Sequence, residues 1–271
     1  MTDYFSYNSS CDLPPDSFRI APSQLSRFLD STARWYRENL LGEAPEFEYS
    51  TASELGTVVH AIAHMYHDTG QADLAAIEAY ISSLPDDVDK ALIREQYPIM
   101  AETLINDFLR LHPGTDAELF TSTEILPGIY AAGTIDSYCS KSFRIRDFKT
   151  MGSLDTARLP SSFPRSYWFQ QLAYAYILTQ CGYRVDFVDL VYVTRSNVGR
   201  ISPTTGKALK DYPSQVHVIT EPITPDSFEL ISGVLKLVAH SVQHWNDHPE
   251  HRYLLAQDFR LYTPPKRALF T

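Results

Sequence analysis

Gly133-Thr-Ile-Asp136 is followed eleven residues later by Asp147-Phe-Lys149, and both stretches have the pattern of adjacent β-strands. Side chains at i and i+2 of a strand share a face, so Asp147 and Lys149 are predicted to point together. If the two strands pair as a hairpin, Asp136 lies next to Asp147 and Lys149 across the sheet. Two carboxylates suit a hard cation such as Mg²⁺, and a neighbouring ammonium can orient a water. The pattern predicts phosphodiester hydrolysis, and its alternative is a solvated hairpin with ordinary charged positions.

The rest of the chain predicts helices before these strands and alternating elements after them. Apolar residues at helical spacing define the helices, and β-branched or aromatic runs bounded by Pro and Gly define the strands. The predicted helices are 23–41, 50–68, 72–83, 87–111, 166–181 and one beginning at Pro225. The predicted strands are 119–126, 129–140, 142–149, 185–194 and 215–221. This order implies an α/β protein with a mixed central sheet flanked by helices.

The 271 residues suffice for one large domain or two small ones. The sequence shows no repeat, low-complexity block or shift in composition, which favours a single domain over 19–271. Within it, a helical part of about 22–112 precedes a catalytic core of about 119–248. Residues 1–18 carry Ser, Asn, Asp and Pro without periodicity, which predicts a flexible arm.

Four segments, in order along the chain, resemble one known family. Tyr130-Ala-Ala-Gly133-Thr-Ile-Asp136 and Arg144-Ile-Arg-Asp147-Phe-Lys149-Thr are similar to the active-site strands of the PD-(D/E)XK nuclease superfamily, above all its RecB-like branch. Leu55-Gly56-Thr-Val-Val-His60 resembles the upstream histidine helix of that branch. Trp168-Phe-Gln170-Gln171-Leu-Ala-Tyr174 resembles its downstream Gln/Tyr helix. The resemblance implies a restriction-endonuclease-like core with an N-terminal helical region.

The resemblance also implies a metal site. Asp136 and Asp147 correspond to metal ligands, and Lys149 to the residue that holds the attacking water or stabilises charge on the phosphate. The backbone carbonyl of Phe148 is implied to complete the shell of the metal, because the family uses the peptide between its acid and its lysine. Glu124, on the strand before Asp136, is either a further acid near the metal or a solvated strand glutamate.

Three histidines lie on the helix predicted for 50–68. His60, His64 and His67 fall at i, i+4 and i+7, opposite the apolar stripe of that helix. The spacing suggests zinc, and the alternative is three polar residues on an exposed helix face. The resemblance selects His60 alone, as an additional metal ligand. It also implies that Gly56, one turn before His60, lets the helix approach the sheet closely.

The downstream helix leaves one choice open. Gln170 and Tyr174 lie four residues apart and therefore share a helix face. In the commoner pattern of the family, however, the glutamine directly precedes leucine, which points to Gln171. Either glutamine could contact the DNA backbone or support Lys149, so both remain candidates beside Tyr174.

The net charge of the protein restricts where DNA could bind to it. A formal charge of −10, from 33 acidic and 23 basic residues, argues against broad nonspecific affinity for nucleic acid. A nuclease of this charge would concentrate its basic groups at the substrate groove. Residues 195–210 contain no acidic residue, and their Gly, Pro, Ser and Asn predict a projecting loop or hairpin. Its four basic residues are predicted to bind the DNA backbone: Arg195, Arg200, Lys207 and Lys210. The alternative is a solvated basic loop with no role.

The cysteines and the apolar runs indicate which cofactors and which cellular location to expect. Cys11, Cys139 and Cys181 show no C-x-x-C spacing, which argues against a zinc site or a disulfide framework. Iron–sulfur members of the resembling family carry an early cysteine and three late ones, which this sequence lacks, so no iron–sulfur cluster is expected. No apolar run approaches the ~20 residues of a membrane span, and the polar N-terminus shows no secretory signal. We expect a cytoplasmic protein, in a bacterial cell or a phage-infected host.

Together with the resemblance, these features predict a deoxyribonuclease that depends on Mg²⁺ or Mn²⁺. A chain of this size without helicase motifs resembles phage or mobile-element exonucleases that act in DNA recombination or repair. One alternative is an endonuclease for branched or flapped DNA. Another is a DNA-end-binding protein that keeps the fold without cleavage. A single-strand-annealing recombinase as partner is suggested by family context alone, and a homo-oligomer would suit processive digestion.

Overall fold

A six-stranded mixed sheet forms the centre of the protein, in a computed structural model that describes residues 4–5, 13–43, 50–152, 158–202 and 204–251. The strands are β1 (Phe18–Ile20), β2 (Asp116–Leu126), β3 (Ile129–Cys139), β4 (Arg144–Met151), β5 (Phe187–Thr194) and β6 (Val216–Pro222). Their spatial order is β1-β3-β4-β5-β6, and β2 also pairs with β3. The predicted α/β class with a mixed central sheet is confirmed, and all five predicted strands are present.

Strand β3 is the junction of the sheet. It pairs with β2 along one edge in antiparallel register. Its other edge is shared, because β1 lies parallel to its start, with Phe18 opposite Ile129, and β4 lies antiparallel to its end, with Ser137 opposite Arg146. Residues 132–136 of β3 pair with neither strand on that edge. Strands β3 and β4 therefore separate at these residues and leave an opening in the sheet.

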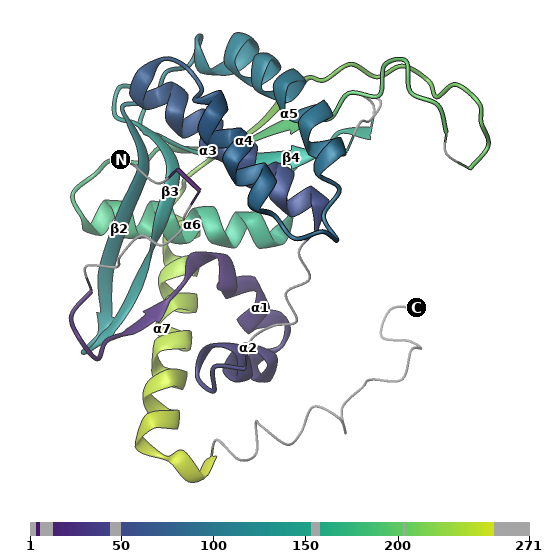
Figure 1. Ribbon diagram of the computed structural model, residues 1–271. Helices are drawn as coiled ribbons and strands as arrows, with labels where there is room; N and C mark the ends of the chain where they lie inside the picture. Colours follow the sequence, from purple (N-terminus) through teal and green to yellow (C-terminus); the bar gives the residue numbers. More distant parts are fainter. Residues whose placement is uncertain (1–3, 6–12, 44–49, 153–157, 203, 252–271) are drawn as a thin grey trace, which may run out of the picture.

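Helices cover both faces of the sheet (Figure 1). They are α1 (Leu25–Asp30), α2 (Thr32–Asn39), α3 (Thr51–Thr69), α4 (Leu74–Ser83), α5 (Lys90–Leu104, continued by a π-helical turn at Ile105–Leu109), α6 (Arg165–Gln180) and α7 (Pro225–Asp247). Helices α3, α4 and α5 share a core with Phe148, Val191 and Val193 of the sheet. Helices α1, α2, α6 and α7 share another with Ile129 and Ala131. None of the described helices is long and apolar enough to cross a membrane.

The helix predicted for 23–41 is two helices, and the cause of this correction is local. Ser31 lies between α1 and α2 with φ −159° and ψ 83°, which is outside the helical region. The break turns α2 relative to α1, so that aromatic residues of both helices reach one core. Phe28 of α1 meets Trp35 of α2 edge-on at 5.2 Å, and Tyr36 meets Trp245 of α7 at 5.1 Å.

The predicted flexible arm is corrected at both of its ends. Phe18 belongs to β1, a strand of three residues that is too short for alternating polarity to reveal. Near the start of the chain, Tyr4 meets His64 of α3 edge-on at 4.8 Å, and Phe5 stacks on Tyr80 of α4 at 4.3 Å. Residues 1–3 and 6–12 of the predicted arm lie outside the described residues.

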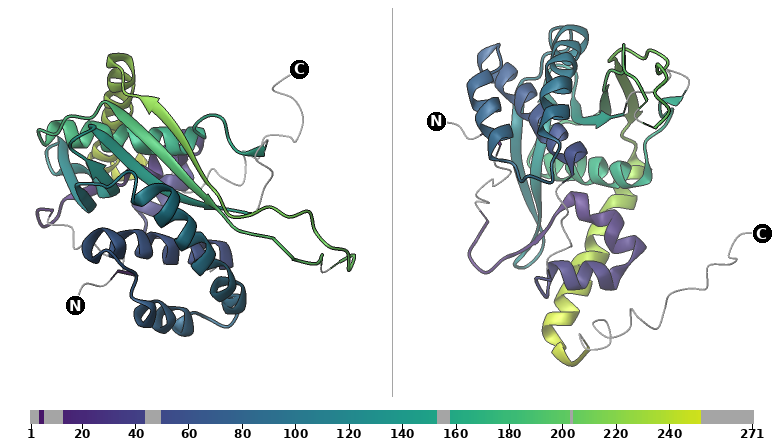
Figure 2. Two further views of the ribbon diagram at one scale, coloured as in Figure 1. Left: turned by 90° about the horizontal axis from the view of Figure 1, so that it is seen from above. Right: turned by 45° about the vertical axis from the view of Figure 1, so that its right-hand side comes forward.

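The connection between β5 and β6 projects beyond the body of the molecule (Figures 1 and 2). Its base is fixed by side chains, because the Ser196 N–H donates to Gln96 Oε1 at 2.9 Å and the Tyr212 N–H donates to Asn197 Oδ1 at 2.6 Å. An isolated antiparallel bridge joins Ile201 to Ala208 farther out. The loop predicted for residues 195–210 is therefore part of a long arm whose base is held by these hydrogen bonds.

Candidate active site

Asp147 and Lys149 lie on β4 and point to the same side of it. Lys149 Nζ is 2.6 Å from Asp147 Oδ2, and the Asp147 side chain is only 4% exposed. Burial alone would lower the pKa of Lys149, but the carboxylates of Asp147 and Asp136 raise it above its ordinary value. Strand β4 thus presents the Lys149 ammonium against a buried carboxylate, which favours its charged form.

Asp136 lies on β3 where that strand separates from β4. Continuing the register of Ser137 and Arg146 by one position sets Asp136 opposite Asp147. The Phe148 N–H donates to Asp136 Oδ2 at 2.8 Å, so this side chain replaces the missing strand partner. The opening in the sheet therefore brings both acids to one place.

His60 is the residue of α3 that reaches these acids. Its Nδ1 lies 3.3 Å from Asp136 Oδ2, and its side chain is 14% exposed. His64 and His67 instead face Asp68, at 3.4 and 3.1 Å. All three histidines line one cavity of about 170 Å³ beside Asp136. Their different partners do not support a zinc site built from the three together.

The electrostatics of this cluster fit a bound divalent cation. His60 Nδ1 is buried, makes no hydrogen bond to any described residue and lies 3.3 Å from Asp136 Oδ2, whereas Asp147 Oδ2 is buried against the Lys149 ammonium. Burial raises the pKa of Asp147, and Asp136 adds to this effect while Lys149 opposes it. The donor atoms of His60, Asp136 and Asp147 do not all lie within 4.8 Å of one another, so an ion would draw the side chains together. Carboxylates with one imidazole suit Mg²⁺ or Mn²⁺.

Glu118 of β2 joins the same cluster, although no sequence motif marked it. It lies between Ala117, opposite Ser137, and Leu119, opposite Ile135, which sets it across from Asp136. Its φ of +46° is in the left-handed region, which a glutamate rarely adopts. Burial, followed by the charge of Asp136, raises its pKa to about 8. The available signal was an acid just before the predicted strand 119–126, but only the strand pairing places it near Asp136.

Replacing Glu118 with Gln is expected to stabilise the metal-free protein at alkaline pH. The folded-state pKa of about 8 exceeds the ordinary value of 4.5 for a glutamate, so folding favours the protonated acid. That stability is present below the unfolded pKa and is lost as pH rises through the folded pKa. Glutamine mimics the protonated form at every pH. The melting temperature in EDTA should rise at about pH 9 and change much less at about pH 5, and an equal rise at both would refute the assignment.

Glu124 lies away from the site, which corrects its expected role as a further acid near the metal. It pairs with Tyr130 in the β2–β3 ladder and is exposed. Tyr130 is six residues from Asp136 along β3, which is roughly 20 Å in a strand. Glu124 Oε1 accepts a hydrogen bond from the Gly128 N–H at 2.9 Å and thereby holds the β2–β3 turn. It is the solvated strand glutamate of the alternative interpretation.

The Gln/Tyr helix is α6, and its geometry distinguishes the two glutamines. Gln170 Nε2 lies 3.5 Å from Asp147 Oδ1, within reach of the acid–lysine pair. Gln171 is fully buried, and neither of its side-chain polar atoms has a hydrogen-bond partner among the described residues. Burial raises the pKa of Tyr174, as do Asp136 and Asp147, while a hydrogen bond with Gln170 opposes this. Gln170 and Tyr174 therefore face the acids together, on the shared helix face.

Two glycines of the motifs differ in how strictly they are needed. A Cβ on Gly133 would lie 2.9 Å from both Cε1 and Oη of Tyr174, so the glycine makes room for that tyrosine beside β3. A Cβ on Gly56 would meet Thr150 Oγ1 at 3.4 Å, which is an ordinary contact. Helix α3 does approach β4 closely at Gly56, but this approach alone does not require a glycine.

The predicted DNA-binding cations all lie on the β5–β6 arm. Arg195 begins the arm beside β4, since its N–H donates to the Met151 carbonyl at 2.9 Å, two residues beyond Lys149. Arg200 Nη2 lies 3.4 Å from Glu95 of α5. Lys207 and Lys210, farther along, are exposed. The base of the arm is thus near the acids, and the remaining cations lead away from them.

Acids on two diverging strands and a lysine beside the second, with a histidine and a Gln/Tyr pair on flanking helices, define a nuclease-type site. The model of the PD-(D/E)XK nuclease superfamily matches residues 19–248, which is most of the chain. The chain therefore belongs to the PD-(D/E)XK nuclease superfamily. Among curated proteins, no significant match was found.

Several solved structures are similar to this chain at low sequence identity. A candidate exonuclease from Eubacterium rectale matches with a TM-score of 0.52 and 13% identity, over 94% of this chain and 86% of that one. A phage-related exonuclease from Haemophilus somnus 129PT gives 0.42 and 10%, over 84% and 96%. An alkaline exonuclease from Laribacter hongkongensis gives 0.37 and 8%, over 76% and 93%. The similarity to the E. rectale structure, with a TM-score of 0.52, supports the assignment of the fold.

Proposed function

We propose that this nuclease is a divalent-metal-dependent deoxyribonuclease that acts as an exonuclease. The observation that carries the proposal is the convergence of Asp136, Asp147 and the charged Lys149 at the opening between β3 and β4. Mg²⁺ or Mn²⁺ would be held by both acids, by His60 and by the backbone carbonyl of Phe148. The ion would supply Lewis-acid stabilisation of charge on the phosphate and lower the pKa of an attacking water.

Three side chains of the site would have the other roles in the reaction. The Lys149 ammonium, fixed 2.6 Å from Asp147 Oδ2, is positioned to orient the attacking water and to stabilise charge that develops on the phosphate. Gln170 would hold the orientation of Asp147 through the contact of its amide with Oδ1. Tyr174, packed against Gly133, would fix the helix that carries Gln170.

Exonuclease action is favoured over internal cleavage by the E. rectale structure, which shares the fold and is described as a candidate exonuclease. DNA recombination or repair, or phage DNA processing, is the setting that we propose for this activity. An endonuclease for branched DNA and a DNA-end-binding protein without cleavage are the competing functions, and one assay separates them.

The assay compares linear and covalently closed circular DNA with Mg²⁺ or Mn²⁺ and with EDTA. An exonuclease degrades linear DNA from its ends, leaves closed circles intact and stops in EDTA. An endonuclease converts circles to linear molecules. A protein that only binds ends retards linear DNA without shortening it. Cleavage that persists in EDTA would refute the metal dependence.

Replacing Arg195, Arg200, Lys207 and Lys210 with Ala is expected to weaken DNA binding and flatten its salt dependence. Each phosphate contact contributes about 0.9 to the slope of log K against log salt, so four contacts would lower it by about 3–4. Binding titrations over a range of salt concentrations measure this slope.

A matched pair of double variants isolates the position of the charges on the arm. Lys207→Ala with Lys210→Ala removes two exposed cations from the arm, and Lys141→Ala with Lys236→Ala removes two exposed cations elsewhere. The first pair should lower the salt slope by about 2 and the second should leave it unchanged. Equal effects of the two pairs would show that net charge, and not the arm, controls affinity.

A further inference from the structure

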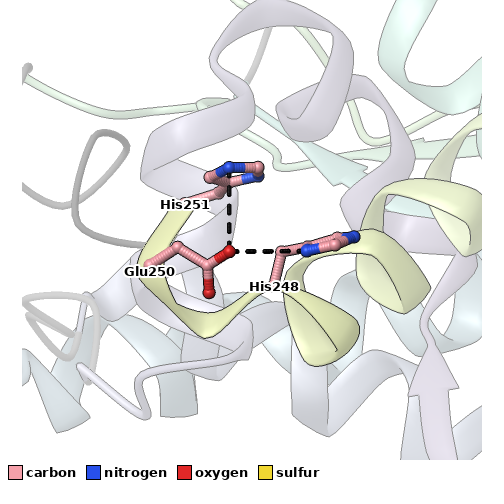
Figure 3. A group of neighbouring side chains, drawn as sticks. All are labelled: His248, Glu250 and His251. Atoms are coloured by element: carbon pink, nitrogen blue, oxygen red, sulfur yellow. Dashed lines mark ion pairs between the residues drawn. The ribbon is translucent and has the colours of Figure 1, made fainter.

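A second group of metal-ligating side chains lies at the end of α7, apart from the candidate active site. His248, Glu250 and His251 come together just after this helix (Figure 3). Helix α7 runs away from the sheet, so this group lies at the opposite end of the molecule from α3 (Figure 1). One donor atom from each residue lies within 4.8 Å of the other two, and no other group of His, Cys, Asp or Glu among the described residues satisfies this condition.

Both histidines of this group form ion pairs with Glu250, at distances close to the spacing of ligands around a metal ion. His248 Nδ1 lies 3.4 Å from Glu250 Oε1, and His251 Nε2 lies 3.9 Å from the same oxygen. Hydrogen bonds of this kind are about 2.7–3.2 Å long. Ligand atoms bound tetrahedrally to zinc at about 2.0–2.1 Å are about 3.3 Å apart. The His–Glu distances of 3.4 and 3.9 Å are close to this spacing, and one donor atom of each of the three residues lies within 4.8 Å of the other two.

His244, one turn before His248 on α7, supports His251 from behind. His244 Nε2 lies 2.9 Å from His251 Nδ1, and their rings stack with centroids 5.0 Å apart. A proton on His251 Nδ1, donated to His244, leaves the Nε2 lone pair directed at the carboxylate oxygen. Metal-ligating histidines commonly donate their second ring N–H in this way, which fixes the tautomer.

We propose that His248 Nδ1, Glu250 Oε1 and His251 Nε2 form a binding site for a transition-metal dication, Zn²⁺ above all, with His244 as a positioning residue. Two imidazoles and one carboxylate suit zinc, whereas Mg²⁺ prefers oxygen ligands. Three protein ligands leave the fourth tetrahedral position to water. The site joins the last turn of α7 to the residues after Pro249. It does not depend on the proposed nuclease function, because it shares no residue with the candidate active site.

The test is a calorimetric titration of the metal-depleted full-length protein with Zn²⁺ in excess Mg²⁺. The double variant His248→Ala with His251→Ala should bind one Zn²⁺ fewer than the wild type, and Glu250→Gln should weaken that same site. His244→Ala should keep the site but bind about 10–100-fold more weakly, as expected for a supporting hydrogen bond. Nuclease activity in Mg²⁺ should be unchanged in the double variant.

His240 provides the matched control, because it is also an exposed histidine of α7. It lies eight residues before His248, about 12 Å along a helix, and is outside the group. His240→Ala should bind Zn²⁺ as the wild type does. Equal Zn²⁺ stoichiometry and affinity in the wild type and the double variant would overturn the proposal. A loss in His240→Ala equal to that in the double variant would overturn it as well.

Discussion

Asp136→Asn is expected to reduce DNA cleavage by at least about 10³-fold, because it removes one of the charges that would hold the metal. Asparagine keeps the size of the side chain and an oxygen that can accept from the Phe148 N–H, so the separation of β3 and β4 should persist. Asp147→Asn should have a loss of similar size. Initial rates on linear DNA at saturating Mg²⁺ measure the effect.

The two acid variants need different controls for folding. Asp147→Asn leaves the Lys149 ammonium in a largely buried site without its partner, so this variant should also lose stability. Asp136→Asn is therefore the cleaner test, with circular dichroism and thermal melting to show an intact fold. Glu124→Ala is the matched control, since it removes an exposed acid from the same hairpin and should cleave normally. Near-normal cleavage by Asp136→Asn would remove that acid from the proposed site.

Lys149→Met is expected to lower the rate of cleavage by about 10²–10³-fold while DNA affinity changes little. Methionine keeps most of the aliphatic stem and loses the ammonium that lies against Asp147 Oδ2. The lysine would act on the attacking water and on transition-state charge, and such interactions affect kcat more than binding. Single-turnover rates at saturating protein, measured beside equilibrium binding in Ca²⁺ or EDTA, separate the two effects.

Lys141→Ala is the control for charge in the second experiment, because Lys141 is an exposed lysine in the turn between β3 and β4. It should bind and cleave DNA as the wild type does. If Lys149→Met instead lost binding and cleavage by the same factor, Lys149 would be a docking residue for the phosphate backbone. Its place beside Asp147 would then be structural.

The elements that carry the chemistry were predictable because their signals are local. The strands predicted at 129–140 and 142–149 correspond to β3 and β4, and the i, i+2 spacing of Asp147 and Lys149 places them on one side of a strand. The apolar spacing of α3 likewise sets His60 on the face opposite its buried stripe. Each of these inferences uses residues close in sequence, where backbone geometry fixes direction.

Other features depend on contacts between residues far apart, and the sequence misjudged them or left them open. Glu118 and Glu124 are both acids of β2, and only the β2–β3 register shows that Glu118 lies across from Asp136 while Glu124 lies at the far turn. The pairing of β1 with β3 joins segments more than a hundred residues apart. The break at Ser31 serves packing against α7, which begins about two hundred residues later.

By itself, the sequence determined the order of the helices and strands apart from β1 and the break at Ser31, because periodicity and turn chemistry act within a few residues. The candidate site residues came instead from the resemblance of four segments to a known family. The tertiary structure alone decided which residues meet. It separated β3 from β4 to admit Asp136, turned Gln170 rather than Gln171 toward Asp147, and brought Glu118 into the cluster. It also placed Arg200, Lys207 and Lys210 farther along the β5–β6 arm, away from the acids. The physical reason is that strand pairing and helix packing are fixed by burial shared among distant segments, which no single segment of sequence encodes.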